Sequence, residues 1–176
     1  MKKLNLYYIN LKYIRDLSNA DDNVLSVSPQ RGKQNRPFVG IIFLLNKQKY
    51  CIPLTSPKEK FKEKKSQLDL IKIYDDKNKN NPKLIGVLNI NNMIPVTDKV
   101  INEIDLIIHY NDSPEIKNLK LLLHKQIHWC RLHADTIENR ANKVYDLVVN
   151  HPEKNRNLTH RSSDFVRLEK ISEKWI

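Results

Sequence analysis

The sequence predicts an α+β fold in which a twisted antiparallel β-sheet is covered by helices and the C-terminal half is mainly helical. Three observations lead to this prediction. Short apolar runs rich in β-branched residues fill the first hundred residues, polar turns separate them, and a helical periodicity begins after Asp98. The chain has 176 residues, of which 40% are hydrophobic, and this is enough to bury a core. We therefore expect a single domain over residues 1–176.

The first hundred residues contain the expected strands, at 4–9, 38–45, 49–54, 68–74, 84–90 and 93–96. After the first strand, Asn10 is placed to cap a helix whose apolar residues recur at helical spacing. Residues 18–36 show no periodicity and are expected to form a long loop, a kind of segment that is often functional. Only three residues separate the runs 38–45 and 49–54, which predicts a hairpin. Five or six strands then form one antiparallel sheet.

The second half of the chain is expected to be helical. The run Asp112-Ser113-Pro114-Glu115 supplies a cap, an early proline and an early acid. It opens a helix whose predicted inward residues are Ile116, Leu119, Leu123, Ile127 and Cys130. The apolar stripe continues after His133, on a second helix or on a bent continuation of the first. Residues 151–163 are expected to form a basic polar loop, and residues 164–175 a closing helix.

The formal charge of +11 suggests a polyanionic partner. Residues 1–66 hold 14 Lys and Arg against 5 Asp and Glu, a net charge of +9, whereas residues 67–176 have a net charge of +2. Nucleic acid is preferred over an anionic membrane, because no long basic amphipathic helix lies in the basic part. A solvated lysine-rich surface is the alternative. The candidate RNA contacts are Lys2, Lys3, Arg31, Lys33, Lys60, Lys62, Lys64 and Lys65.

Other classes of protein are not indicated. The two cysteines, Cys51 and Cys130, are far apart and belong to no Cys/His cluster, so we expect no disulfide framework and no structural zinc. His124 and His128 have the spacing of a metal pair, but residue 125 is Lys and no third ligand is evident. No signal peptide or membrane span is apparent. We expect a cytoplasmic protein without metal, cofactor or membrane partner.

The segment from Thr55 to Glu59 has two interpretations. Ser56 as N-cap, Pro57 as first helical residue and Glu59 three positions after the cap would form a capping box. This interpretation leaves Lys58 unexplained, because a cation in the first helical turn opposes the helix dipole. Free amides at a helix start, two hydroxyls and a nearby ammonium describe a phosphate site instead. We favour the phosphate site and keep capping as the alternative.

The run Pro53-Leu54-Thr55-Ser56-Pro57-Lys58 resembles the P-L-T/S-S-P-K motif of the ToxN/AbiQ family of type III toxin–antitoxin systems. It is preceded, as in that family, by Pro37-Phe38-Val39-Gly40. Further pieces follow in the family's order: Tyr7-Tyr8-Ile9, Lys12-Tyr13-Ile14, Gly86-Val87-Leu88-Asn89, Met93-Ile94-Pro95 and Leu123-His124-Lys125-Gln126. The resemblance covers about residues 4–149, and several motifs in order are more specific than any one alone.

Membership in this family implies a barrel like that of the Kid/MazF toxins and a metal-independent endoribonuclease activity. The ribose 2′-hydroxyl attacks the adjacent phosphate, which leaves a 2′,3′-cyclic phosphate and a 5′-hydroxyl. The implied substrate is mRNA, and no DNA partner is expected. The implied inhibitor is a repeat-derived RNA pseudoknot, which alternates head to tail with the toxin in a closed assembly.

The resemblance also implies which residues are catalytic. Lys58 and the hydroxyls of Thr55 and Ser56 match family active-site positions, Tyr13 corresponds as well, and Arg36 stands where relatives place a basic residue. Some relatives carry a tyrosine where this chain has Arg31-Gly32-Lys33, so that ring has no counterpart here. Two alternatives remain: a non-catalytic RNA-binding module on the same Kid-like fold, and a growth regulator that binds protein.

Overall fold

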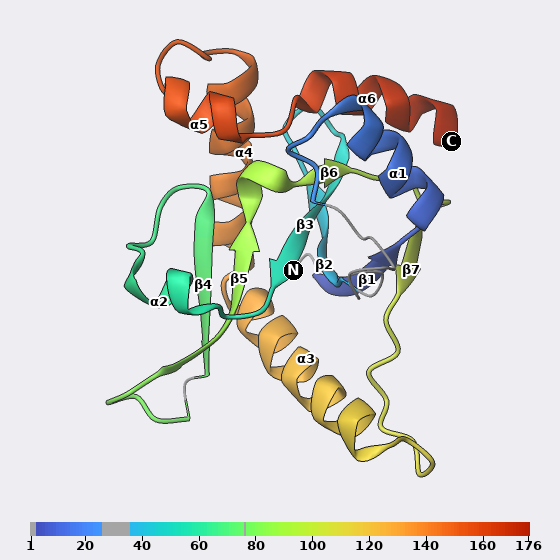
Figure 1. Ribbon diagram of the computed structural model, residues 1–176, viewed down its shortest axis with the longest axis vertical. Helices are drawn as coiled ribbons and strands as arrows, with labels where there is room; N and C mark the ends of the chain where they lie inside the picture. Colours follow the sequence, from blue (N-terminus) through green and yellow to red (C-terminus); the bar gives the residue numbers. More distant parts are fainter. Residues whose placement is uncertain (1–2, 26–35, 76) are drawn as a thin grey trace.

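An antiparallel sheet organises the computed structural model, which describes residues 3–25, 36–75 and 77–176 (Figure 1). Its seven strands are β1 (Asn5–Ile9), β2 (Phe38–Phe43), β3 (Lys49–Thr55), β4 (Leu70–Asp75), β5 (Lys83–Asn89), β6 (Ile94–Pro95) and β7 (Ile101–Glu103). The strand order is β4-β5-β3-β2-β1-β7, and β6 pairs with β3 off this path. Every pairing is antiparallel, which confirms the predicted type of sheet.

The sheet is open and does not close into a barrel. β4 and β7 form its two edges, and no pairing joins them within the described part of the chain. Closure requires a strand tilt and a stagger that bring the two edges together, and the pattern of apolar residues determines neither. The antiparallel sheet with packed helices is therefore confirmed, whereas the expected Kid/MazF-like barrel is not.

The N-terminal elements follow from local signals in the sequence. The side chain of Asn10 accepts hydrogen bonds from the backbone N–H groups of Lys12 (2.9 Å) and Tyr13 (3.1 Å), and α1 (Leu11–Ala20) begins there. The helix runs three residues into the predicted loop. The predicted hairpin forms between β2 and β3, and its turn is closed by a hydrogen bond from Leu44 N to Gln48 O of 3.0 Å.

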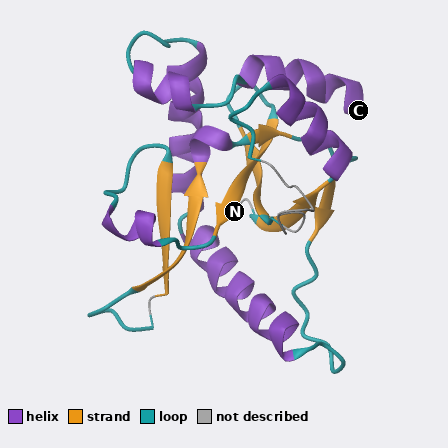
Figure 2. Cartoon of the chain, viewed as in Figure 1, coloured by secondary structure: helices purple, strands orange, loops and turns teal. Residues whose placement is uncertain are grey.

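The C-terminal half is mainly helical, as predicted (Figure 2). Its elements are α3 (Pro114–Leu132), α4 (Ala134–Val149), α5 (Arg156–Arg161), α6 (Phe165–Ser172) and the 3-10 turn η3 (Glu173–Trp175). A second 3-10 turn, η2 (Ile90–Asn92), follows β5, and the short α2 (Glu59–Glu63) follows β3. Ser113 caps α3 by accepting a hydrogen bond from Ile116 N at 3.3 Å. The chain bends at His133, so α3 and α4 are two helices.

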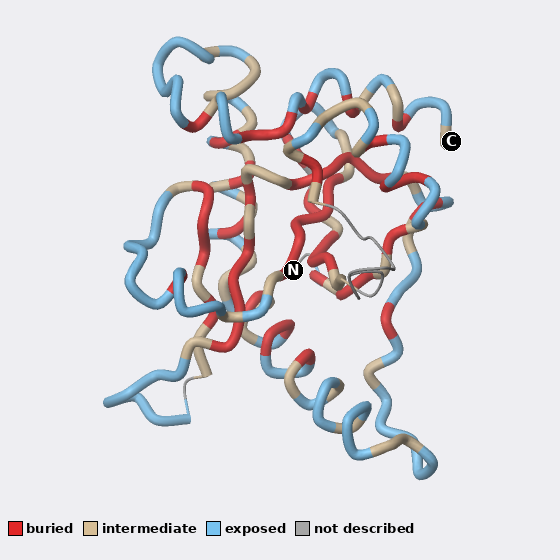
Figure 3. Tube along the Cα trace, in the orientation of Figure 1, coloured by how far each residue is buried: buried red, intermediate tan, exposed pale blue. Residues whose placement is uncertain are grey.

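Three predicted features are wrong. β7 occupies part of the region after Asp98 where helix was expected, because three residues are too few to show strand alternation. α5 forms inside the predicted basic loop, because Asn155 caps the backbone N–H of Leu158 at 3.0 Å and the Leu158 side chain is buried. Ile116 and Leu119 are exposed, because the first turns of α3 extend beyond the sheet (Figure 3).

The core lies on both faces of the sheet. Alternate residues of a strand point to opposite faces, so Ile52 joins the larger cluster beneath α3 and α4 while Cys51 joins the smaller one beneath α1. Residues 50–54 are all buried, and β3 thus runs through the centre of the molecule. Its C-terminal end, at Thr55, is where the chain emerges to the surface.

Candidate active site

The chain turns at the surface after β3, and the predicted capping box does not form there. The N-cap of α2 is Lys58, which has extended backbone angles (φ −85°, ψ 154°), and no side chain caps the helix. α2 starts later than predicted, and this start directs the Phe61 side chain inward, where it is buried against Leu70 and Val87. Lys58 therefore lies outside the helical turn, and its charge does not oppose the helix dipole. The conflict that favoured a phosphate site is absent. Any such site must depend on the side chains themselves.

The pairing of β2 with β3 brings Arg36 to this turn. Phe38 lies opposite Pro53, and Leu54 N donates a hydrogen bond of 3.0 Å to Pro37 O. Because the two strands run in opposite directions, the residue before Pro37 lies beside the residue after Leu54. Arg36 is thus a neighbour of Thr55, although 18 residues separate them along the chain.

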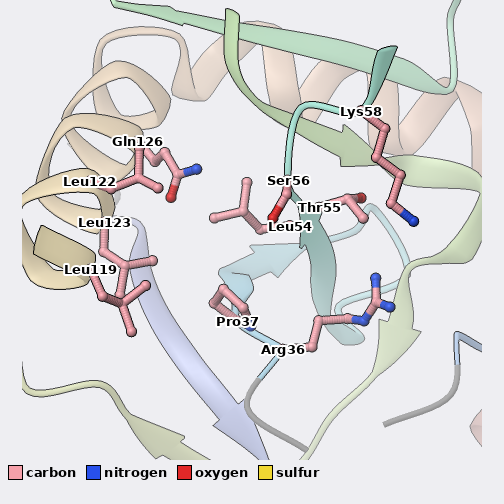
Figure 4. A pocket seen from close by; sticks show the side chains of 10 residues that line it. All are labelled: Arg36, Pro37, Leu54, Thr55, Ser56, Lys58, Leu119, Leu122, Leu123 and Gln126. Carbon is pink, nitrogen blue, oxygen red and sulfur yellow. The ribbon is translucent and has the colours of Figure 1, made fainter. Parts of the chain in front are cut away.

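A pocket of about 320 Å³ opens at this point between the end of β3 and α3. Its lining is Arg36, Pro37, Leu54, Thr55, Ser56, Lys58, Leu119, Leu122, Leu123 and Gln126. Figure 4 shows leucines of α3 and Gln126 on one side, and the charged ends of Arg36 and Lys58 approaching each other on the other side. The structure thus brings together four of the five predicted catalytic residues.

Neither cation of the pocket is neutralised by a carboxylate of the described residues. The Nε of Arg36 is buried without a hydrogen-bond partner in that part of the chain. Burial lowers the pKa of the Arg36 guanidinium, because desolvation disfavours the charged form, yet arginine remains charged in proteins. The Lys58 side chain is exposed. Two converging cations without an acid partner form a site for an anion such as phosphate.

Two hydroxyls lie between the cations and the leucines. Asn89 Nδ2 donates a short hydrogen bond to Thr55 Oγ1, which leaves the Thr55 O–H free to donate to a ligand. The hydroxyl of the exposed Ser56 points toward the leucine side of the pocket (Figure 4). Asn89 belongs to the Gly86-Val87-Leu88-Asn89 motif of the family resemblance, but no role for it follows from the sequence alone. In the structure Asn89 lies next to the end of β3, and its side chain orients the Thr55 hydroxyl.

Tyr13, the fifth predicted catalytic residue, lies elsewhere. Its side chain is fully buried, and its hydroxyl donates a 2.6 Å hydrogen bond to Pro95 O. Its ring packs edge-on against Trp175, with 5.5 Å between ring centroids. Burial raises the pKa of Tyr13, which opposes proton exchange near neutral pH. A catalytic role for Tyr13 stays a prediction, and this geometry favours a structural one.

The predicted RNA-binding lysines are exposed wherever the structure describes them, at Lys3, Lys60, Lys62, Lys64 and Lys65. Lys2, Arg31 and Lys33 lie outside the described residues. Lys62 is held by an ion pair with Glu59 of 2.7 Å, so its charge is partly compensated.

A second hollow, of about 610 Å³, adjoins the turn before α2. It is lined by Pro57, Lys62, Lys72, Tyr74, Asn81, Pro82, Lys83 and Leu84. The sequence does not single out Lys72 and Lys83, because they belong to the part of the chain with nearly balanced charge.

Signals for other activities are weak. No group of three or more His, Cys, Asp or Glu suited to a metal ion occurs among residues 3–25, 36–75 and 77–176. His124 Nε2 lies 2.8 Å from Leu106 O, an interaction that ties α3 to the preceding loop. In the same ranges, no helix has the length and apolar character needed to cross a bilayer.

Comparison with known proteins connects this chain to one family. The family model described as toxin ToxN of type III toxin–antitoxin systems matches residues 5–173. Endoribonuclease ToxN of Bacillus thuringiensis subsp. kurstaki is 36% identical over 141 residues, which are 80% of this chain and 66% of that protein. Endoribonuclease ToxN of Pectobacterium atrosepticum is 29% identical over 147 residues, 83% of this chain and 82% of that protein.

Solved structures show the same similarity over nearly the whole chain. One is from a type III system in which a non-coding RNA pseudoknot selectively inhibits the toxin; it has a TM-score of 0.81, 29% identity, and coverage of 99% of this chain and 98% of that one. Another is AbiQ, a lactococcal anti-phage endoribonuclease of a type III system. It has a TM-score of 0.80 and 26% identity, with 99% and 98% of the two chains covered.

Proposed function

The chain belongs to the ToxN toxin family of type III toxin–antitoxin systems, and from this premise we propose that it is an endoribonuclease whose active site is the pocket between β3 and α3. The observation that carries the proposal is the convergence of Arg36 and Lys58, two cations without an acid partner among the described residues, beside the hydroxyls of Thr55 and Ser56 (Figure 4). Two relatives in sequence and one of similar structure are named as endoribonucleases.

The proposed reaction is an internal transesterification of RNA. The 2′-hydroxyl gives up its proton to solvent water, and its oxygen bonds to the adjacent phosphorus. The bond from phosphorus to the 5′-oxygen breaks, and that oxygen takes up a proton from the Lys58 ammonium, which solvent then reprotonates. The products are a 2′,3′-cyclic phosphate and a 5′-hydroxyl, and no water is consumed. Negative charge grows on the non-bridging phosphate oxygens in the transition state, so donors fixed around them accelerate the reaction.

The lining residues suit this electrostatic task. The Lys58 ammonium and the Arg36 guanidinium flank the phosphate, and the Thr55 hydroxyl, which Asn89 orients, donates to one of its oxygens. The described lining contains no carboxylate and no imidazole. We therefore assign the pocket mainly to charge stabilisation, with the Lys58 ammonium as the proton donor to the 5′-oxygen.

The path of the substrate follows from the two hollows beside the turn. Ser56 and Lys58 line the active-site pocket, while Pro57 between them lines the lysine-rich hollow. A single strand of mRNA lying across the turn places the scissile phosphate in the pocket and neighbouring phosphates near Lys72 and Lys83. These contacts release condensed counterions, so binding weakens as the salt concentration rises.

The proposed inhibitor is an RNA antitoxin that occupies the same surface. A type III relative of the same fold is inhibited by a non-coding RNA pseudoknot. We extend this to a repeat-derived pseudoknot that alternates head to tail with the toxin in a closed assembly. Such a contact joins two different surfaces of the toxin, and a ring forms when the rotation per unit closes.

The reaction is tested by incubating the purified protein with a defined RNA in EDTA. We expect cleavage to persist, with 5′ ends that polynucleotide kinase labels without prior phosphatase treatment and with 3′ ends that carry a cyclic phosphate. A 2′-deoxy substitution at the cleaved nucleotide removes the attacking group and should abolish cleavage at that bond only.

Two outcomes would overturn the proposed chemistry. Products with 5′-phosphate ends require attack by water, and loss of cleavage in EDTA with recovery on adding magnesium requires a catalytic metal. RNA that shifts in a gel but stays intact would favour the alternative of a non-catalytic RNA-binding module.

A further inference from the structure

Gln126 of α3 places a buried amide in the wall of the pocket. Only 4% of its surface is exposed, and its Nε2 donates a 2.7 Å hydrogen bond to Ile85 O of β5. This bond determines which end of the amide is the nitrogen, because a flipped amide would set two oxygens against each other. β5 makes room for the amide at Gly86, where an added Cβ would lie 2.9 Å from Nε2.

The oxygen of the same amide has no partner. Gln126 Oε1 is buried, and no donor of the described residues hydrogen-bonds to it. The amide is directed into the pocket beside Leu122 and Leu123 (Figure 4). A buried acceptor left without a donor is unfavourable, so this position favours a ligand that brings an N–H group.

We propose that this part of the pocket holds one unpaired base of the substrate RNA, and that Gln126 selects a base with an exocyclic amine. The inference rests on the proposed function and adds a subsite for the base next to the site for the phosphate. Leu119 and Leu122 supply apolar surface for the flat faces of the base, and Gln126 Oε1 accepts a hydrogen bond from its edge. RNA-binding proteins commonly recognise splayed-out bases through such edges.

The chemistry of the lining favours an amine over a carbonyl. Adenine, cytosine and guanine each carry an exocyclic amine that can donate a hydrogen bond to the Gln126 oxygen. Uracil has none, and its single N–H lies between two carbonyl oxygens. A uracil oxygen that faces the leucine side chains or the Gln126 oxygen meets no hydrogen-bond donor in those groups. The subsite is therefore expected to disfavour uracil.

The test uses a short RNA with one cleavage site and nucleoside analogues that lack only the amine. Purine riboside replaces adenosine, inosine replaces guanosine, and zebularine replaces cytidine, one position at a time around the cleaved bond. We expect one position at which removal of the amine lowers kcat/KM by about 10-fold, the effect of losing one hydrogen bond to a buried acceptor. With 2′-deoxy substrates, which are not cleaved, the Kd should rise at the same position.

Substitution of Gln126 assigns the effect to this residue. In Gln126→Met the side chain has a similar shape but no amide, so the analogue and the natural base should react at the same rate. Gln67→Met is the matched control, because Gln67 is exposed and lies outside the pocket lining, and it should keep the preference. The ratio of the two rates does not change when a variant is merely less stable. If Gln126→Met does not fold, the analogue series with the unmodified protein still decides.

Failure of this inference differs from failure of the proposed function. An enzyme that cleaves RNA but reacts equally with every analogue, or that prefers uracil at each position, overturns the base subsite and leaves the endoribonuclease intact. If Gln126→Met keeps the preference for the amine, a residue other than Gln126 selects the base. A protein that cleaves no RNA overturns the proposed function itself.

Discussion

At the scale of single residues, the proposed active site depends on side chains that neighbouring strands bring together. Thr55 ends β3 and Ser56 follows it, Arg36 precedes β2, and Asn89 ends β5. Their proximity follows from the antiparallel pairing of the three strands. Each group alone is an ordinary surface or strand-end residue, whereas together they form the phosphate site that we propose.

Ser56→Ala distinguishes the two interpretations of the turn. Ser56 is exposed and caps no helix, so the free energy of unfolding should change by less than about 0.5 kcal/mol. Cleavage should fall by about 10-fold or more, because a donor to the phosphate oxygens is lost. Urea unfolding and cleavage rates measure the two effects. A variant with full activity and lowered stability would restore the capping interpretation.

Tyr13→Phe tests whether Tyr13 is catalytic or structural. The substitution removes the hydrogen bond to Pro95 O inside the core, so the protein should lose about 1–3 kcal/mol of stability. The folded fraction should cleave RNA at the wild-type rate. An unchanged melting temperature together with lost cleavage would support the catalytic role implied by the family resemblance.

These residues show how far sequence can predict a site. The motif at the end of β3 and the family resemblance led to Thr55, Ser56, Lys58 and Arg36 as candidates, and all four line one pocket. The sequence did not reveal the burial of Tyr13, because its position behind β6 depends on tertiary packing. Nor did it reveal the roles of Asn89 and Gln126, since each depends on contacts with a strand distant in sequence.

At the scale of elements, short segments are held by contacts that no local sequence pattern predicts. β7 has three residues and α5 has six, too few for a periodicity to stand out. α5 is fixed to the start of β4 by Arg161, whose Nε and Nη2 donate to the two carboxylate oxygens of Asp69 at 2.8 and 2.9 Å. Long elements with clear caps, such as α1 and α3, were predictable.

Arg161→Ala should destabilise the protein by about 1.5–3 kcal/mol, because it leaves the carboxylate of Asp69, 4% exposed, buried without its partner. Arg156→Ala on the same helix is the control, since Arg156 is exposed, and its effect should stay below about 0.5 kcal/mol. Urea unfolding gives both values. Equal midpoints for the two variants would show that the Asp69–Arg161 pair contributes nothing to stability.

At the scale of the whole molecule, the antiparallel sheet and the helical second half were predictable, whereas the open edges were not. Strand number and pairing direction follow from patterns within the chain, but closure depends on how β4 and β7 lie relative to each other. The basic charge of the first 66 residues predicted a polyanionic partner. In the assembly that we propose, this partner is the antitoxin RNA, and each RNA joins two toxin molecules.

Light scattering tests the proposed assembly. We expect a monomer in the absence of RNA and a discrete equimolar complex after a repeat-derived RNA pseudoknot is added, because each RNA bridges two toxin surfaces. A stable dimer that forms without RNA and does not change on its addition would contradict the head-to-tail arrangement.

The central claim is that the pocket between β3 and α3 cleaves RNA, and the activity of Lys58→Ala tests it most directly. Lys58 is exposed and forms no ion pair within the described ranges, so the variant should melt at the wild-type temperature. It should yield no cleavage products from a defined RNA in EDTA, because the main counter-charge for the phosphate is lost. Lys143→Ala, an exposed lysine of α4, should cleave normally. Wild-type cleavage by Lys58→Ala would contradict the account.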